Sequence, residues 1–238
     1  MKIVVNVDDY GFTKSEVDGV IYAYQNGVVT STSCLANVSD ENLEYAALKA
    51  KENPGLAINC HLVLTAGNSL TKGKTICKPD GSFYGNNDVD YTKMDREEVY
   101  QEFKAQIERF IKFFGKKPQS LDSHHRRYAI MDTINMKEII YRLTEEYGIH
   151  KGRDFNDDVY YAGCLYNEFT VDNFKALAAE AYHSGIACIE IACHVAFVDE
   201  ELYKKTSYTY QRIQELKAVT CKEMLDFYSE YKIEKATY

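Results

Sequence analysis

The sequence predicts an α/β fold, a distorted (β/α) TIM-like barrel with mainly parallel strands, formed by residues 1–238 as a single domain. Short apolar runs alternate with longer segments of helical period, as in consecutive βα units. The number of these units suits a barrel, with an open doubly wound sheet as the alternative. The first strand lacks the G-x-G-x-x-G pattern of a dinucleotide site. No linker-like tract divides the chain.

The first half of the chain gives three such units. Residues 2–7 form an apolar strand, and Thr13 with Glu16 forms a capping-box pattern that starts a helix ending near Gly27. A second strand and a helix closed by Pro54-Gly55 come next, followed by a third strand. Their expected ranges are 32–36, 40–51 and 56–60.

Residues 66–93 interrupt this alternation, because they are rich in Gly, Asn, Asp and Lys. A connection of this length is often functional, and we expect it to lie over the mouth of the barrel. The second half then resumes with strands expected at 120–121, 187–193 and 232–237. Helices are expected at 95–114, 133–147, 170–183, 208–219 and 221–230.

Composition excludes several classes of protein. The net charge is -8 with acidic and basic residues interspersed, which argues against nucleic-acid binding. No apolar stretch approaches a membrane span or a signal peptide. The seven cysteines form no C-x-x-C pair and read as reduced thiols. We therefore expect a cytoplasmic protein with neither membrane nor nucleic acid as a partner.

Four of the expected strands end in Asp or His. Strand one leads into Asp8 and Asp9, the third into His61, the "QSL" strand into the run 122–125, and "ACIEIAC" into His194. Barrel enzymes place their chemistry at this end of the strands. One Asp and two His can hold a divalent metal, and a second Asp can act as a base for metal-bound water. The pair of aspartates is explained if one binds the metal and the other takes a proton.

The chain resembles the YdjC-like (ChbG/HpnK) carbohydrate deacetylases along nearly its whole length. The resemblance begins with "NVDDYGFTKSEVDGVIYAYQNGVVTSTSCLAN" and continues through later motifs in the same order. These are "HLVLTAGNSL", "DGSF", "SLDSHH", "IEIACH" with "VDEEL", and "SYTYQRIQELKAV". It implies a distorted barrel that hydrolyses the amide of N-acetylated mono- or oligosaccharides of the chito-oligosaccharide type.

The resemblance also implies residue roles. Asp9, His61 and His125 are the implied metal ligands, Asp8 the general base and His194 the general acid. The implied cofactor is one divalent ion, Mg²⁺ from the resemblance, whereas two imidazoles and a carboxylate also suit Zn²⁺. A homodimer is the commonest assembly for such a protein. Residues expected to orient a ligand or contact substrate are Tyr10, Asn37, Asp122, His124, Arg126 and Arg127.

The sequence also departs from the family pattern. Arg126, Arg127 and Tyr128 replace the usual His-Val-His, and Val195-Ala196 replaces Pro-Gly. The two arginines could bind an anionic sugar substituent or lie solvated on the surface. Two alternatives therefore stay open, a catalytically altered sugar-binding or regulatory protein and a metal-dependent sugar phosphoesterase. Arg212 could reach the pocket or lie on a helix surface, and the helix surface is the favoured of these two positions.

Overall fold

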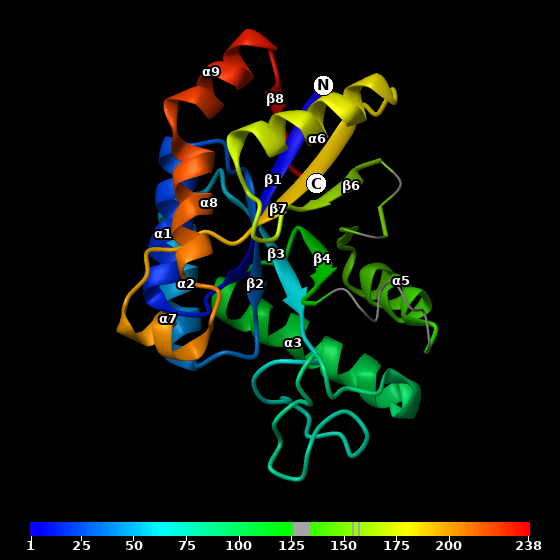
Figure 1. Cartoon of the computed structure of the whole chain (residues 1–238). Helices are drawn as coiled ribbons and strands as arrows, with labels where there is room; N and C mark the ends of the chain where they lie inside the picture. The colour runs from blue at the N-terminus through cyan, green and yellow to red at the C-terminus, as the bar shows by residue number, and fades with distance from the viewer. Residues whose placement is uncertain (126–133, 154, 157) are drawn as a thin grey trace.

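Among the described residues, eight parallel strands form one sheet that curls into a half-barrel (Figure 1). The structure is a computed structural model that describes residues 1–125, 134–153, 155–156 and 158–238. The strand order is β5-β4-β3-β2-β1-β7-β6, and β8 pairs with the start of β1. The strands are β1 (Lys2–Tyr10), β2 (Ser31–Leu35), β3 (Ala57–Leu62), β4 (Ser120–Ser123), β5 (His150–Lys151), β6 (Tyr160–Cys164), β7 (Cys188–Cys193) and β8 (Glu234–Lys235).

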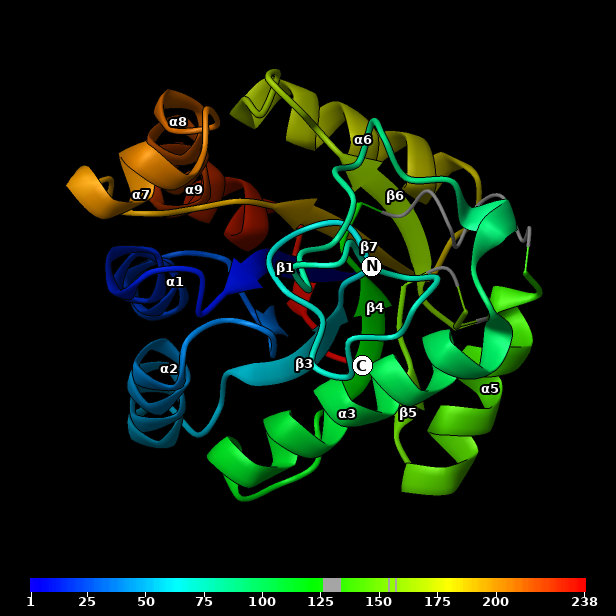
Figure 2. The same cartoon turned by 90° about the horizontal axis from the view of Figure 1, so that it is seen from below.

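Helices surround the curled sheet on its outer side (Figure 2). They are α1 (Lys14–Asn26), α2 (Asp40–Glu52), α3 (Arg96–Phe114), α5 (Met136–Tyr147), α6 (Val171–His183), α7 (Glu200–Lys205), α8 (Tyr210–Thr220) and α9 (Lys222–Glu230). The predicted distorted barrel of parallel strands is therefore confirmed. In the part of the chain that the structure describes, β5 and β6 end the pairing path, so the barrel stays open between them.

The central strand is the first one. β1 pairs with β7 on one side and with β2 on the other, and its residues from Ile3 onward are buried. A strand covered on both faces reads as a continuous apolar run, which explains why residues 2–7 were recognisable in the sequence. The strand continues beyond the predicted end and includes Asp8, Asp9 and Tyr10.

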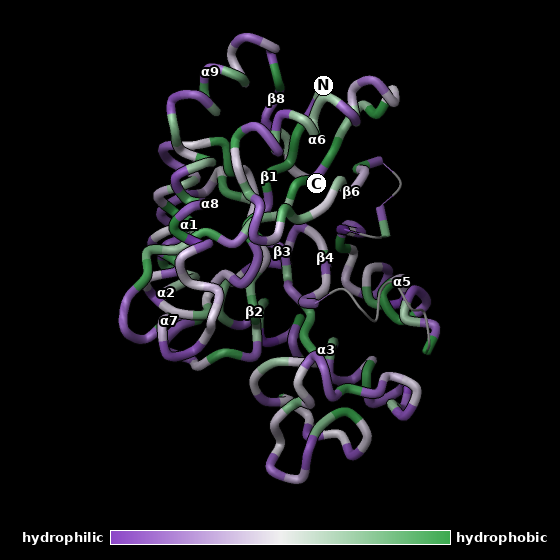
Figure 3. The backbone as a smooth tube through the Cα atoms, viewed as in Figure 1, coloured by the Kyte–Doolittle hydropathy of each residue, from purple (hydrophilic) through white to green (hydrophobic). Residues whose placement is uncertain are grey.

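The helices follow their sequence signals. Thr13 caps α1 by accepting the Glu16 N–H at 3.1 Å, as predicted, whereas the Glu16 carboxylate reaches back to Gly11 N–H. In α3 the apolar side chains recur at helical spacing and turn inward, with Phe103 and Phe110 fully buried. Each buried side chain of this size contributes roughly 1.5–3 kcal/mol. Hydrophobic and hydrophilic stretches alternate along the helical tubes (Figure 3).

The long segment 66–93 is anchored to α3 by two carboxylates one turn apart. Glu102 accepts hydrogen bonds from Thr71 N and Oγ1, at 2.9 and 2.7 Å. Glu98 accepts from Thr75 N and Oγ1, at 2.7 and 2.6 Å. In Figure 2 the segment lies in front of the strand ends. None of the described helices combines the length and the hydropathy needed to cross a membrane.

Candidate active site

A cavity of about 630 Å³ opens at the C-terminal ends of the strands, beneath the long loop. Residues from β1, β2, β3, β4 and β6 line it, together with helices α7 and α8, the segment between them, and the segments that follow β1, β3, β4, β5, β6 and β7. They are Asp8, Asp9, Phe12, Leu35, His61, Ala66, Asn86, Ser123, His124, His125, Arg153, Tyr161, Cys164, Tyr166, His194, Lys205, Thr206, Tyr208 and Arg212. The cavity is thus where barrel enzymes place their chemistry.

Asp8 and Asp9 both line the cavity, although successive residues of a regular strand point to opposite faces. The register of β1 against β2 shifts between Val7 and Tyr10, which marks a bulge. Within it Asp9 has φ = 75°, a left-handed conformation that Asp tolerates better than most residues. Bulges re-aim side chains next to active sites. The local break in the strand therefore brings two adjacent carboxylates to one place.

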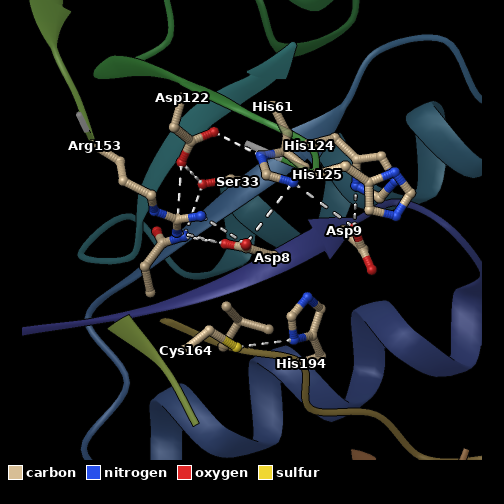
Figure 4. A network of polar contacts seen from close by, with 12 residues as sticks. Asp8, Asp9, Ser33, His61, Asp122, His124, His125, Arg153, Cys164 and His194 are labelled. Carbon is tan, nitrogen blue, oxygen red and sulfur yellow. Dashed lines mark hydrogen bonds and ion pairs between the residues drawn. The ribbon is translucent and has the colours of Figure 1, made fainter. Parts of the chain in front are cut away.

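Arg153 holds Asp8 with two parallel hydrogen bonds (Figure 4). Arg153 Nη1 donates to Oδ2 at 2.8 Å and Nη2 to Oδ1 at 2.7 Å. Both side chains are buried. Burial on its own would raise the pKa of Asp8, but Arg153 and His61 lower it well below its usual value. Asp8 is therefore ionised and held in one orientation.

Asp122 contacts the His61 ring and fixes its orientation. His61 Nδ1 lies 2.7 Å from Asp122 Oδ1, and Ser33 donates a hydrogen bond to the other Asp122 oxygen. With Nδ1 engaged, Nε2 faces the aspartate pair, 3.9 Å from Asp8 Oδ2 and 3.8 Å from Asp9 Oδ1. Burial on its own would lower the pKa of His61, but Asp122 and Asp8 raise it.

Asp9, His61 and His124 form a compact group of possible metal ligands. Their ligand atoms lie within 4.8 Å of one another, with His124 Nδ1 3.2 Å from Asp9 Oδ1. In the described part of the chain, Asp9 Oδ1 is a buried oxygen without a hydrogen-bond partner. A buried oxygen left open beside two imidazoles fits a divalent cation. The donor set therefore suits the expected cofactor.

His124, rather than His125, completes this group. His125 Nδ1 lies 2.8 Å from Thr65 Oγ1, and the His125 backbone has φ = 59°. Burial lowers the pKa of His125 to about 3. The rings of His124 and His125 touch, with centroids 3.8 Å apart. Both histidines line the cavity, but of the two only His124, which was expected to play a supporting role, has a ring nitrogen within the compact group formed with Asp9 and His61.

His194 follows β7 directly and faces the cavity from the opposite wall (Figure 4). Its Nδ1 lies 3.8 Å from Cys164 Sγ, and its ring contacts Tyr166 and Tyr208 at centroid distances of 5.3 and 5.6 Å. Its backbone N–H donates to Glu215. Burial lowers the pKa of His194 to about 4, against the opposing effect of the two aspartates. His194 is thus fixed by its backbone and by two aromatic walls.

Helix α8 supplies two buried charged residues to the site. Arg212 Nη2 donates to Asp9 Oδ2 at 2.7 Å, and only 3% of Arg212 is exposed. Of the two positions considered for Arg212, the favoured one on the helix surface is therefore wrong, and the side chain reaches the pocket. One turn further on, Glu215 accepts a hydrogen bond from Tyr208 at 2.5 Å in addition to the one from His194. Burial raises the pKa of Glu215 to about 7.

Other predicted residues lie elsewhere. Tyr10 is fully buried against α2, where its hydroxyl donates to the Ala46 carbonyl, so it supports the core and not the cavity. Asn37 donates to the Ala66 carbonyl at 2.8 Å and so holds the long loop in place. The expectations for Arg126 and Arg127 fall outside the described residues.

Arg153 is the main site residue that the sequence analysis missed. It follows β5, a strand of two residues that no apolar run announces. Gly152 lets this turn approach β4 closely, since a Cβ there would stand 2.4 Å from the Leu121 carbonyl oxygen. The sequence does carry one usable signal. Gly152 and Arg153 follow closely after Gly148, the glycine that ends the preceding helix, where a turn from helix to strand is expected.

Comparison with known sequences places the chain in a family. The family model described as YdjC-like protein matches residues 2–230. A carbohydrate deacetylase of Clostridium beijerinckii is 31% identical over 249 aligned positions, which cover 98% of this chain and 97% of that relative. A chitooligosaccharide deacetylase of Yersinia enterocolitica is 30% identical, with 92% and 90% covered.

Solved structures show the same fold. A crystal structure from Enterococcus faecalis V583, of a protein assigned only provisionally to cellobiose-phosphate cleavage, matches with a TM-score of 0.87 and 28% identity. The match covers 100% of this chain and 97% of the Enterococcus faecalis chain. A family 4 carbohydrate esterase from Streptomyces lividans, in complex with acetate, matches with a TM-score of 0.57 and 11% identity over 99% and 92% of the two chains. That second likeness concerns the fold alone.

Proposed function

The chain belongs to the YdjC-like protein family, and on that premise we propose that it is a metal-dependent hydrolase that removes acetyl groups from N-acetylated sugars. One observation carries the proposal. A compact Asp-His-His group lies beside an arginine-held Asp8, and His194 faces both across one cavity. Listeria innocua also has a relative named carbohydrate deacetylase 2, which is 31% identical to this chain.

Asp9, His61 and His124 are the residues that would hold the metal. Asp122 keeps His61 Nε2 free for binding by engaging Nδ1, and Arg212 fixes the second oxygen of Asp9. When bound, a divalent cation would polarise the acetyl carbonyl and lower the pKa of a water molecule. The second possible ligand group, Asp8 with His61 and Asp122, shares His61 with the first. Within the described residues, these groups outline one ion site, which disfavours a two-metal phosphoesterase.

Asp8 is the proposed general base. It is ionised, buried beside the ligand group and oriented by Arg153. In the reaction, Asp8 takes a proton from water as the water oxygen attacks the acetyl carbon. The low pKa of Asp8 makes it a weak base, so the step depends on a water molecule that is already acidified.

His194 is the proposed general acid. It stands on the wall opposite Asp8, within the same cavity. His194 gives a proton to the sugar nitrogen as the C–N bond breaks, and the products are acetate and a free amino sugar. Burial lowers the pKa of His194, and this effect exceeds that of the negative charges of Asp9 and Asp8, which raise it. The acid is therefore one that releases its proton readily.

Acetate release from N,N'-diacetylchitobiose tests the function. The protein is stripped with EDTA and then restored with Mg²⁺ or Zn²⁺, and acetate is measured in each state beside a sample without protein. We expect release only after metal is restored, and the ion that restores it identifies the cofactor. Bound metal without acetate from neutral or anionic N-acetyl sugars would contradict the enzyme and favour an altered sugar-binding protein.

A further inference from the structure

Glu190 is an acidic residue inside an apolar strand. It lies in β7 between Ile189 and Ile191, and none of its surface is exposed. A buried carboxylate is costly unless it is paired and hydrogen-bonded. Glu190 Oε1 accepts hydrogen bonds from Arg153 Nε at 2.9 Å and Nη2 at 2.6 Å. The guanidinium that holds Asp8 is therefore held in turn by Glu190.

Tyr238 binds the other oxygen of Glu190. Its hydroxyl donates to Glu190 Oε2, and its backbone carbonyl accepts a hydrogen bond from Gln119. Ala236 N–H donates to the Ile3 carbonyl at 3.0 Å, so the segment runs along the start of β1. Burial and the charge of Glu190 raise the pKa of Tyr238 far above its usual value. The hydroxyl therefore keeps its proton and stays a donor.

We propose that Glu190 and Tyr238 are positioning residues for Asp8, acting through Arg153. The inference rests on the proposed function, in which Asp8 is the base. The guanidinium is planar, with donors in a rigid fork. Its Nη1 and Nη2 atoms bind Asp8, and its Nε and Nη2 atoms bind Glu190. Any rotation of the guanidinium plane that weakens its contact with one carboxylate therefore also disturbs its contact with the other.

Tyr238 completes the chain of contacts because it fixes the plane of Glu190. With Oε1 taken by Arg153 and Oε2 by Tyr238, the carboxylate is anchored at both oxygens. A hydrogen-bonded path thus runs from Tyr238 through Glu190 and Arg153 to Asp8. A small misplacement of a catalytic group can cost up to about 100-fold in rate. The orientation of the base therefore depends on a residue 230 positions away in the sequence.

The test compares Tyr238→Phe with Tyr231→Phe in metal-loaded protein. Tyr231 is 65% exposed, so its variant is a matched control that should leave the kinetics unchanged. We expect Tyr238→Phe to lower kcat about 5- to 50-fold with KM and metal content unchanged. A purely structural role would instead lower the folded fraction and leave kcat per folded molecule intact. A kcat within twofold of the wild type would overturn the proposal.

A second measurement separates this proposal from the proposed function. The ¹⁵N–¹H resonance of Arg153 Nε, assigned through its loss in Arg153→Lys, reports the contact with Glu190 without any turnover. We expect it to shift in Tyr238→Phe and to stay in place in Tyr231→Phe. If the wild type releases no acetate, the proposed function fails and this resonance decides alone. An unmoved Arg153 signal in Tyr238→Phe would then overturn the linkage.

Discussion

Asp8 and Asp9 are neighbours in the sequence with different expected roles. Asp8 is bound by Arg153 and is the proposed base, whereas Asp9 Oδ1 belongs to the proposed ligand group and accepts no hydrogen bond from the described residues. The bulge in β1 makes this division possible because it turns both side chains into the cavity. Conservative amide substitutions can therefore separate the two roles with little change of shape.

Asp8→Asn should keep the metal and lose most of the rate, whereas Asp9→Asn should lose both together. The loss in Asp8→Asn should reach about 10²- to 10⁴-fold, as for removal of a general base. Asn also tolerates the left-handed backbone at position 9. Because Asp9→Asn removes the charge that pairs with the buried Arg212, the folded fraction of each variant is measured by circular dichroism and the rates are given per folded molecule. Metal per protein after dialysis and acetate release distinguish the two variants, with Asp172→Asn on the exposed side of α6 as control. Near-normal turnover in Asp8→Asn would make the base assignment wrong.

The two adjacent histidines give the second prediction. His124→Gln should weaken metal binding by more than about 100-fold, because removing a ligand costs at least as much as removing its support. His125→Gln should change the metal affinity only slightly, since His125 contacts Thr65 and lies outside the ligand group. Calorimetric titration of metal into each stripped variant measures both affinities. The reverse order would return the ligand position to His125.

The same pair shows what sequence reasoning cannot resolve at this scale. The run 122–125 was recognisable as part of a site because it ends a strand. Which of two consecutive histidines points at Asp9 depends on the backbone turn after β4, where His125 takes a left-handed conformation. No residue type in the run announces that turn, so the choice between the two needed the structure.

At the scale of elements, α1 is fitted to the segment that carries His194. Gly19 lies in the interior of α1, where glycine is unfavourable for a helix. A Cβ at this position would stand 2.6 Å from Ala196 Cα and from Phe197 N. The glycine therefore allows the helix to touch the backbone just after the proposed acid.

Gly19→Ala should destabilise the protein although alanine is the better helix former. Helix propensity alone would add about 1 kcal/mol of stability, but overpacking against backbone costs about 1–3 kcal/mol. The displaced segment should also lower kcat, because it leads from His194. Urea unfolding and acetate release measure the two effects. The control is Ser229→Ala in α9. Gly115→Ala would not serve, because Gly115 has a positive φ. A more stable Gly19→Ala would show that the segment yields without strain.

Elements were predictable where their sequences are apolar or periodic. β1, β3 and β7 are buried strands that read as short apolar runs, and α3 shows an apolar stripe at helical spacing. β5 has two residues and β6 is partly exposed, so neither stands out in the sequence. Arg153 and Cys164 belong to these two regions, which is why the site prediction lacked that wall of the cavity.

At the scale of the whole molecule, the site exists only in the folded chain. Arg153 and Asp8 are 145 positions apart, and Arg212 and Asp9 are 203 apart. These pairs bring buried charges together, and each charge would be costly without its partner. Folding and the assembly of the site are therefore one event, and the titration of the buried carboxylates should make the stability of the entire protein depend on pH.

Glu215 allows this pH dependence of stability to be measured. Its pKa is about 7 in the folded chain and near 4.5 in an unfolded one. A carboxyl with a raised pKa favours the folded state at low pH, so its contribution is lost as the pH rises from about 4.5 through about 7. Glu215→Gln removes this titration. The free energy of unfolding of the variant should therefore rise relative to the wild type across that window, by at most ~3 kcal/mol, and level off above it.

Urea unfolding of both proteins in EDTA at pH 5, 6, 7 and 8 measures the difference, since EDTA removes the separate pH dependence of metal binding. A difference that stays constant from pH 5 to 8 would show that Glu215 is ionised throughout, stabilised by Tyr208 and the His194 N–H against the effect of burial.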